Sequence, residues 1–235
     1  MCQRIATYDA VAAEYYDPVR HPTCANFSEL SNQFLNPRIR KYATVPIDIL
    51  EIGAGRSTVA PILSAAGLPV AGLTLLDKSA AMLQHSRIWA ERGAQLVVDD
   101  ACMPQLPPES FRLVVASLGD PYNCRSFWKS TEKLLQPHGI CLFTIPAREW
   151  AERFRRGSAL SLAEFALADG STVLVRSKIP PLDEQIRLIT GAGLHVIETQ
   201  GLAAAHLSGP RSAKLLVTAE TAELPILHGL VAQKV

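Results

Sequence analysis

The sequence predicts an α/β fold: a doubly wound, mostly parallel seven-stranded sheet with an N-terminal helical lid and a helical insertion after the fifth strand. Between residues 44 and 146, short apolar runs rich in β-branched residues alternate with amphipathic stretches, which is the pattern of β-α-β units. Glycine or proline closes most of these segments. Strands joined in this way run parallel, through right-handed crossovers.

Residues 1–43, before the first strand, are expected to form the lid. A helix at 5–17 is predicted because Thr7 can cap it and Pro18 stops it. An ordered loop follows, and a second helix at 27–41 ends in basic residues, which suit a helix C-terminus.

The core, residues 44–146, is expected to hold five strands and three helices. The strand segments are apolar and too short for helices, whereas the helix segments repeat apolar residues at helical spacing and end at glycine or proline. We expect strands at 47–52, 70–77, 95–100, 111–117 and 140–145, and helices at 57–66, 78–92 and 124–136.

After the core, the pattern is interrupted by an inserted flap, residues 147–180. Arginines that alternate with aromatic residues indicate a helix within 147–169, with a strand at 172–178. Residues 181–235 are expected to form the C-terminal part of the sheet, with a helix at 181–190 and strands at 194–199 and 214–219. Together, residues 1–235 are predicted to form a single domain.

Composition excludes several classes of protein. The 235 residues carry a formal net charge of +1, which does not suggest a nucleic-acid partner. No apolar run has the length of a membrane span, and the N-terminus lacks the apolar core of a signal peptide, so we expect no membrane partner and a cytoplasmic location. The five cysteines form no CxxC pair and HExxH is absent, so reduced thiols and no metal site are expected.

Acidic residues end the first three predicted strands. Glu51 precedes the turn Gly53-Ala54-Gly55, and Asp77 and the pair Asp99-Asp100 end the next two strands. Ligands of open α/β sheets bind at the carboxyl ends of the strands, where an acid about 20 residues after the glycine turn can bind ribose hydroxyls. Position 58 is Thr and no GK[ST] sequence follows, so neither pyrophosphate motif is complete.

The turn at 50–55, LEIGAG, resembles motif I of the class I S-adenosylmethionine-dependent methyltransferases. The later motifs of that family also have counterparts in order. These are LLDKS at 75–79, VDDA at 98–101 with LP at 106–107 and SF at 110–111, and LLQPHGICL at 134–142. The resemblance covers 47–146 well and 181–219 loosely, and it makes 44–146 the cofactor-binding core.

The resemblance implies S-adenosylmethionine as the cofactor and a role for each matching residue. Gly53, Ala54 and Gly55 would pack against its methionine part, and Glu51 would orient the turn and reach the ammonium. Asp77, followed by Lys78, would bind the ribose hydroxyls. Adenine would meet Asp100 or Asp99 together with Ala101, and Ser117 would line the methyl-transfer channel.

The substrate is expected to lie beside Asp120, Tyr122 and Asn123, which follow the fourth strand. This segment superficially resembles the [DNS]-P-P-[YF] motif of methyltransferases that act on nucleic-acid bases. It has one proline and lies two residues late, so a nucleic-acid substrate is disfavoured. Tyr16 and His21, in the predicted lid, could close over the same place.

The function we expect is methyl transfer from S-adenosylmethionine to a small molecule. A protein or nucleic-acid substrate, or a methyltransferase-fold protein that binds without catalysis, are the alternatives. An NAD-dependent oxidoreductase is disfavoured by Thr58 and by the lack of a Tyr-x-x-x-Lys pair. Neither a catalytic residue nor an oligomeric state follows from the sequence.

Overall fold

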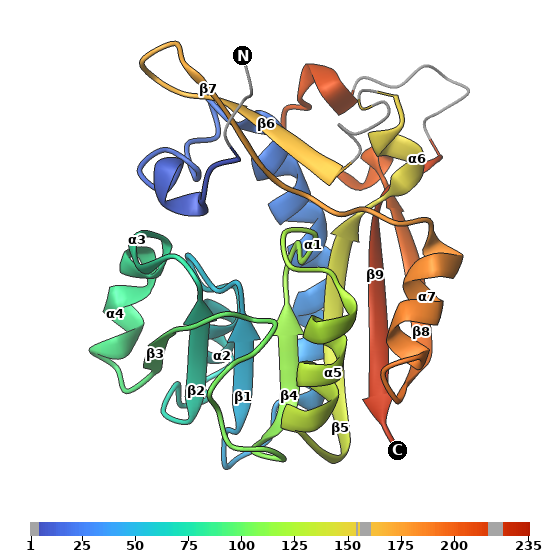
Figure 1. Cartoon of the computed structure of the whole chain (residues 1–235). Helices are drawn as coiled ribbons and strands as arrows, with labels where there is room; N and C mark the ends of the chain where they lie inside the picture. Colours follow the sequence, from blue (N-terminus) through green and yellow to red (C-terminus); the bar gives the residue numbers. More distant parts are fainter. Residues whose placement is uncertain (1–4, 154, 156–160, 216–222) are drawn as a thin grey trace.

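The structure is a computed structural model that describes residues 5–153, 155, 161–215 and 223–235. Its main sheet has seven strands in the order β3-β2-β1-β4-β5-β9-β8 (Figure 1). The five strands from β3 to β5 are parallel, and β9 runs antiparallel to both β5 and β8. The prediction of a mostly parallel seven-stranded sheet is confirmed.

Strand β1, Ile49–Ile52, lies at the centre of the parallel part and all four of its residues are buried. It pairs with β2, Leu73–Asp77, and with β4, Phe111–Ala116. Strand β3, Gln95–Val98, forms one edge of the sheet. A parallel strand covered on both faces reads as a continuous apolar run, which is why these strands could be placed from the sequence.

Helices cover both faces of the sheet (Figure 1). One face packs against α1, Pro22–Tyr42, and α2, Val59–Ala65. The other packs against α5, Arg125–Leu134, and α7, Leu182–Thr190. Beside β2 and β3, the predicted helix 78–92 is divided into α3, Ala80–Leu83, a 3₁₀ turn at Gln84–Ser86, and α4, Arg87–Ala90.

The antiparallel end of the sheet corrects one prediction. A strand was expected at 214–219, but Ala213–Leu215 is a 3₁₀ turn and 216–219 lie outside the described residues. The seventh strand is β9, Pro225–Lys234, which pairs with β5, Leu135–Pro146, and with β8, Leu194–Ala203.

The sequence pattern hid β9 because Gly229 interrupts it, and a glycine normally weakens a strand. The glycine is needed there, since a Cβ at this position would collide with the ring of Phe34 from α1.

The N-terminal prediction is also wrong in part. The expected helix 5–17 is a single 3₁₀ turn, Tyr8–Ala10, followed by turns. Helix α1 starts at Pro22, before the expected position, because proline suits the first turn of a helix. The N-terminal segment instead packs its aromatic rings against Phe165 and donates the Ala6 N–H to the carbonyl of Leu174, at 2.7 Å.

The insertion after β5 is mainly a β-hairpin. It opens with one short helix, α6, Arg148–Ala151, and continues as β6, Leu162–Ala166, paired antiparallel with β7, Thr172–Arg176. The strand expected at 172–178 is confirmed, whereas in the described part of the expected helical flap the α-helix is limited to α6. The hairpin and the N-terminal segment lie above the carboxyl ends of the parallel strands (Figure 1).

No helix among the described residues is both long and apolar enough to cross a membrane.

Candidate active site

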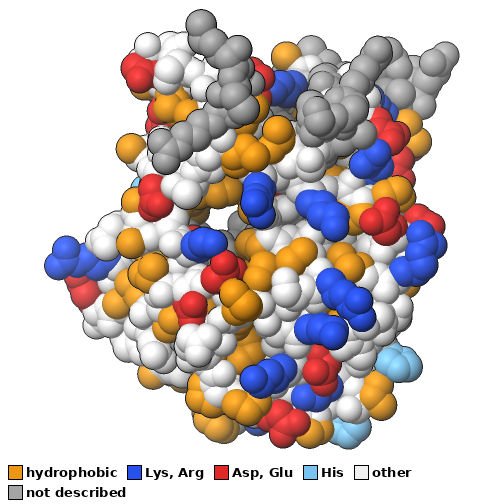
Figure 2. Space-filling view, in the orientation of Figure 1, with side chains coloured by type: hydrophobic (Ala, Val, Ile, Leu, Met, Phe, Trp, Pro, Cys, Tyr) orange, Lys and Arg blue, Asp and Glu red, His pale blue; other side chains and the backbone are white. Residues whose placement is uncertain are grey.

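A cavity of about 2230 Å³ lies between the carboxyl ends of the parallel strands and the cover made by the N-terminal segment and the β6–β7 hairpin. Figure 2 shows its opening near the middle of the face, bordered by hydrophobic side chains and a few charged ones. Pockets for one drug-sized ligand measure roughly 300–1000 Å³, so this cavity has room for two. The predicted site residues that line it are Tyr16, Glu51, Gly53, Ala54, Asp77, Lys78, Asp100, Ala101, Ser117, Asp120 and Tyr122.

Glu51 holds the turn after β1 together. Its carboxylate accepts hydrogen bonds from the Ser57 hydroxyl and from the backbone N–H groups of Thr58, at 2.7 Å, and Val59, at 3.3 Å. These three donors lie at the N-terminus of α2, so the Glu51 side chain caps that helix. Burial raises the pKa of Glu51 to about 7. With these donors in place, Glu51 positions the glycine turn, while its expected contact with a ligand's ammonium stays a prediction.

Asp77, at the end of β2, joins the same turn to the next loop. Its Oδ2 accepts from the N–H of Gly55 at 3.0 Å, and its Oδ1 accepts from the N–H of Ser79 at 2.9 Å. Burial raises the pKa of Asp77 above its usual value. Each oxygen keeps a free lone pair, so the carboxylate can still accept hydroxyl donors from a ligand in the cavity.

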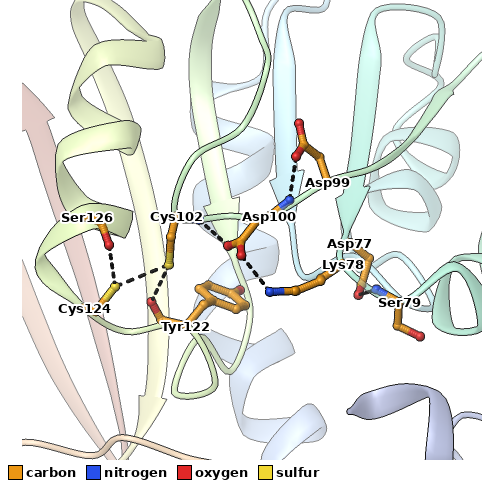
Figure 3. A network of polar contacts seen from close by, with 9 residues as sticks. All are labelled: Asp77, Lys78, Ser79, Asp99, Asp100, Cys102, Tyr122, Cys124 and Ser126. Atoms are coloured by element: carbon orange, nitrogen blue, oxygen red, sulfur yellow. Dashed lines mark hydrogen bonds and ion pairs between the residues drawn. The ribbon is translucent and has the colours of Figure 1, made fainter.

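The two acids after β3 have different surroundings, which separates them as candidates. Asp99 accepts from the backbone N–H groups of Asp100 and Gln105, both at 2.7 Å, and stabilises its own loop. Asp100 lines the cavity and pairs with Lys78 at 2.7 Å (Figure 3). The sequence did not decide which of these two acids would reach the ligand, and the structure brings Asp100 to the cavity.

Two tyrosine hydroxyls lie at the glycine turn. A Cβ on Gly53 would come within 2.7 Å of the Tyr122 hydroxyl, and one on Gly55 would collide with that of Tyr16. Tyr122 donates to the carbonyl of Ile52 at 2.9 Å, and Tyr16 accepts from the N–H of Arg56 at 2.7 Å. The absence of side chains at Gly53 and Gly55 thus leaves room for Tyr122 and Tyr16 of the same chain. Tyr16 lies at the end of the cavity that contains the glycine turn.

The segment after β4 bends sharply into the cavity. Leu118 has a φ of 53°, a backbone conformation that residues other than glycine rarely adopt. Its N–H donates to the hydroxyl of Thr144 at 2.9 Å, and Ser31 joins Thr144 to Ser117 through two hydrogen bonds of 2.7 Å. This buried network, which includes a residue of α1, stabilises the bend that directs Asp120 toward the cover.

Asp120 is a buried acid at the end of the cavity that faces the hairpin. It is 8% exposed, and burial raises the pKa of its carboxyl to about 6, against the opposing effects of a hydrogen bond from Ser177 and the charge of Arg155. Arg155 donates to the Ser177 hydroxyl at 2.7 Å. Burial also raises the pKa of Tyr8 well above its usual value, so that nearby phenol stays protonated. A carboxyl that titrates near neutrality beside a cavity is a candidate proton acceptor.

The structure does not bring His21 and Asn123 to the cavity. The amide of Asn123 bonds to Gln185 at 2.6 Å and to the indole N–H of Trp128 at 2.9 Å, so it joins α5 to α7. His21 packs edge-on against Phe165, with ring centroids 5.3 Å apart. Neither side chain is among the described residues that line the cavity, and their predicted substrate contacts are corrected to structural roles.

His21→Ala is therefore expected to lower the free energy of unfolding by about 0.5–1.5 kcal/mol, the size of one aromatic pair, and to leave turnover unchanged. Chemical denaturation measures the first effect, with the exposed His195→Ala as a matched control. A fall in turnover with unchanged stability would restore His21 to the site.

Sequence reasoning missed the residues that reach the cavity through tertiary contacts. Tyr8, Cys24 and Phe165 line it from the N-terminal segment, α1 and β6. Arg155 is one of the arginines from which the sequence predicted a helix and no contact with the cavity. Its alternation with aromatic residues was the one available signal.

The described residues contain no group of three or more His, Cys, Asp or Glu side chains placed to bind a metal ion.

Neither a scan against models of protein families nor a search of curated proteins found a match to this chain. Many solved structures do match its fold. The methyltransferase CcbJ from Streptomyces caelestis is 15% identical, with 97% of this chain and 96% of that chain covered and a TM-score of 0.65. An S-adenosylmethionine-dependent methyltransferase from Mesorhizobium loti is 16% identical, with coverages of 84% and 96% and a TM-score of 0.60.

A third similar structure is the glycopeptide N-methyltransferase MtfA in complex with S-adenosylhomocysteine. It is 19% identical, with 85% of this chain and 87% of that chain covered and a TM-score of 0.54. At such identities the likeness concerns the fold. The chain has the class I, Rossmann-like fold of S-adenosylmethionine-dependent methyltransferases.

Proposed function

We propose that this protein transfers a methyl group from S-adenosylmethionine to a small-molecule acceptor. The observation that carries the proposal is the covered cavity, which runs from the acids after β2 and β3 to the buried carboxyl of Asp120. Its two ends have different chemistry, as a cofactor and an acceptor require.

The cofactor end would hold the adenosyl group through the residues at the strand ends. Asp77 would accept from the ribose hydroxyls, because both of its oxygens retain a lone pair beside the cavity. Asp100 and Ala101 would meet adenine, and Gly53 and Ala54 would pack against the methionine part. S-adenosylmethionine supplies a methyl group on a sulfonium, which is a good leaving group.

The acceptor end would hold the second substrate between aromatic rings and charged side chains. Tyr8 and Phe165 form walls of this end, and the buried Asp120 and the partly exposed Arg155 are charged groups that face the same space. An amine or hydroxyl acceptor must lose a proton as its new bond to carbon forms. Asp120 would take that proton, and Ser177 and Arg155 would hold its carboxylate in place.

A small acceptor fits better than a nucleic acid because the site is covered. The N-terminal segment is attached to both sides of the cavity, since Ser79 donates to Asp9 at 2.5 Å and Ala6 donates to Leu174 at 2.7 Å. Acidic and basic side chains are mixed on the face around the opening (Figure 2). Binding a phosphate backbone requires a basic surface.

Two measurements test the proposal. Calorimetry should detect S-adenosylhomocysteine binding, and the protein should transfer labelled methyl from S-adenosylmethionine into the small-molecule fraction of a cell lysate. Binding without any transfer would favour a non-catalytic methyltransferase-fold protein. Label in the protein or nucleic-acid fraction alone would overturn the small-molecule acceptor, and a failure to bind would overturn the cofactor.

A further inference from the structure

Two thiols meet beside the acids that follow β3. Cys102 and Cys124 are 22 residues apart in the sequence, and their sulfur atoms lie 3.3 Å apart (Figure 3). Both are half-buried, and neither is in a disulfide. A disulfide bond requires sulfurs about 2.0 Å apart, so a shift on the order of 1 Å would join them. Cys102 lines the cavity, which gives small oxidants access to the pair.

The two thiols differ in acidity. Partial burial opposes ionisation of Cys124, but hydrogen bonds from Ser126 and from the backbone N–H of Phe127, at the start of α5, outweigh it and lower the pKa of this thiol. Ser126 Oγ lies 3.0 Å from the Cys124 sulfur. Burial, the neighbouring Cys124 and the charge of Asp100 raise the pKa of Cys102. Cys124 is thus suited to attack an oxidant and Cys102 to react with the product.

Cys102 is also connected to the proposed adenine contact. Its backbone N–H donates to Asp100 at 2.9 Å, and its carbonyl accepts from the Ser130 hydroxyl at 2.8 Å. Drawing its sulfur toward Cys124 would move the loop that carries Asp100 toward α5. The ion pair between Asp100 and Lys78 shares that loop, so the edge of the cavity would change shape with it.

We propose that Cys102 and Cys124 form a reversible disulfide with hydrogen peroxide as oxidant, and that this bond weakens binding of the adenosyl ligand. The Cys124 thiolate attacks the peroxide, its O–O bond breaks, and a sulfenic acid and hydroxide form. The Cys102 sulfur then displaces the sulfenic oxygen, and the S–S bond forms as water leaves. In total two thiols lose two electrons and two protons, and one peroxide becomes two waters. A dithiol reductant reverses the change.

The effect on binding rests on the proposed function, whereas formation of the disulfide does not. Peroxide treatment of the full chain should remove two hydrogens from its mass, and peptide mapping should place the bond between residues 102 and 124. S-adenosylhomocysteine should then bind about tenfold more weakly than to the reduced protein, as for one disturbed hydrogen bond to a charged group. Reduction should restore the affinity.

Matched variants separate this pair from the other thiols. Cys24→Ser should still lose two hydrogens, whereas Cys102→Ser and Cys124→Ser should not, and their ligand affinity should not respond to peroxide. Absence of the 102–124 bond, or equal affinity of the oxidised and reduced protein, would overturn the proposal. If the reduced protein does not bind S-adenosylhomocysteine, the proposed function fails instead, while the mass measurement still decides whether the disulfide forms.

Discussion

Replacing Asp120 with asparagine is expected to lower kcat for methyl transfer by about 10²–10⁴-fold, the range for loss of a positioned general base. Asparagine has nearly the same shape and can still accept from Ser177, but it cannot take a proton from the acceptor. Affinity for S-adenosylhomocysteine should be unchanged, because Asp77 and Asp100 lie at the other end of the cavity. Single-turnover kinetics with saturating cofactor measures the change.

The same variant should remove a pH dependence. Burial raises the pKa of Asp120 to about 6, so its basic, deprotonated form predominates above that pH. The rate of the original protein should therefore rise as pH increases through about 6, and the Asp120→Asn variant should lack this rise. Arg155 and Tyr8 face the same carboxyl, but neither changes charge near this pH, since arginine stays protonated and burial raises the pKa of Tyr8.

Asp169→Asn is the matched control, because it makes the same chemical change in an exposed turn of the β6–β7 hairpin. Its kcat and pH profile should equal those of the original protein. If Asp120→Asn raises KM and leaves kcat unchanged, Asp120 binds the acceptor without moving its proton. Thermal unfolding of both variants shows whether a loss of activity comes from a loss of folded protein.

Asp77→Ala is expected to weaken S-adenosylhomocysteine binding by about 1–3 kcal/mol, the cost of leaving polar groups unpaired. The variant removes the proposed ribose contact and also frees the N–H of Gly55, which Asp77 holds at 3.0 Å. Both losses affect the glycine turn, so the variant should act on affinity more than on the chemical step. Isothermal calorimetry measures the change.

Asp48→Ala is the control for this effect. Asp48 lies just before β1, at the opposite end of the strand, where it pairs with Arg112 at 3.6 Å. Its removal should leave ligand affinity unchanged. Equal affinities of Asp77→Ala and the original protein would exclude Asp77 from the ligand site.

The parallel strands and the acids at their ends could be predicted because both are local properties. A buried parallel strand is an apolar run, and its last residue points to the ligand edge of the sheet wherever the rest of the chain lies. Glu51, Asp77 and Asp100 were found in this way. Their individual tasks followed only in part, since Glu51 orients the turn by capping α2, whereas the choice between Asp99 and Asp100 was left open until the structure placed Asp99 in its own loop.

The cover over the cavity could not be predicted by the same reasoning. The N-terminal segment has the composition of a helix, but its aromatic residues pack against the hairpin, and this contact outweighs the weak helix propensity of a short segment. Strand β9 was missed because Gly229 interrupts its apolar pattern. Only the structure shows that Phe34 occupies the space that a side chain at this position would need.

By itself, then, the sequence determined the sheet class, the edge of the sheet where a ligand is expected and the resemblance to methyltransferases. Only the tertiary structure decided what lies opposite that edge. It joined Asp120 to Ser177 and Arg155, brought Cys102 to Cys124, and moved His21 and Asn123 away from the cavity. The physical reason is that a strand or helix follows from neighbours in the chain, whereas burial, charge and close contact depend on residues that only folding brings together.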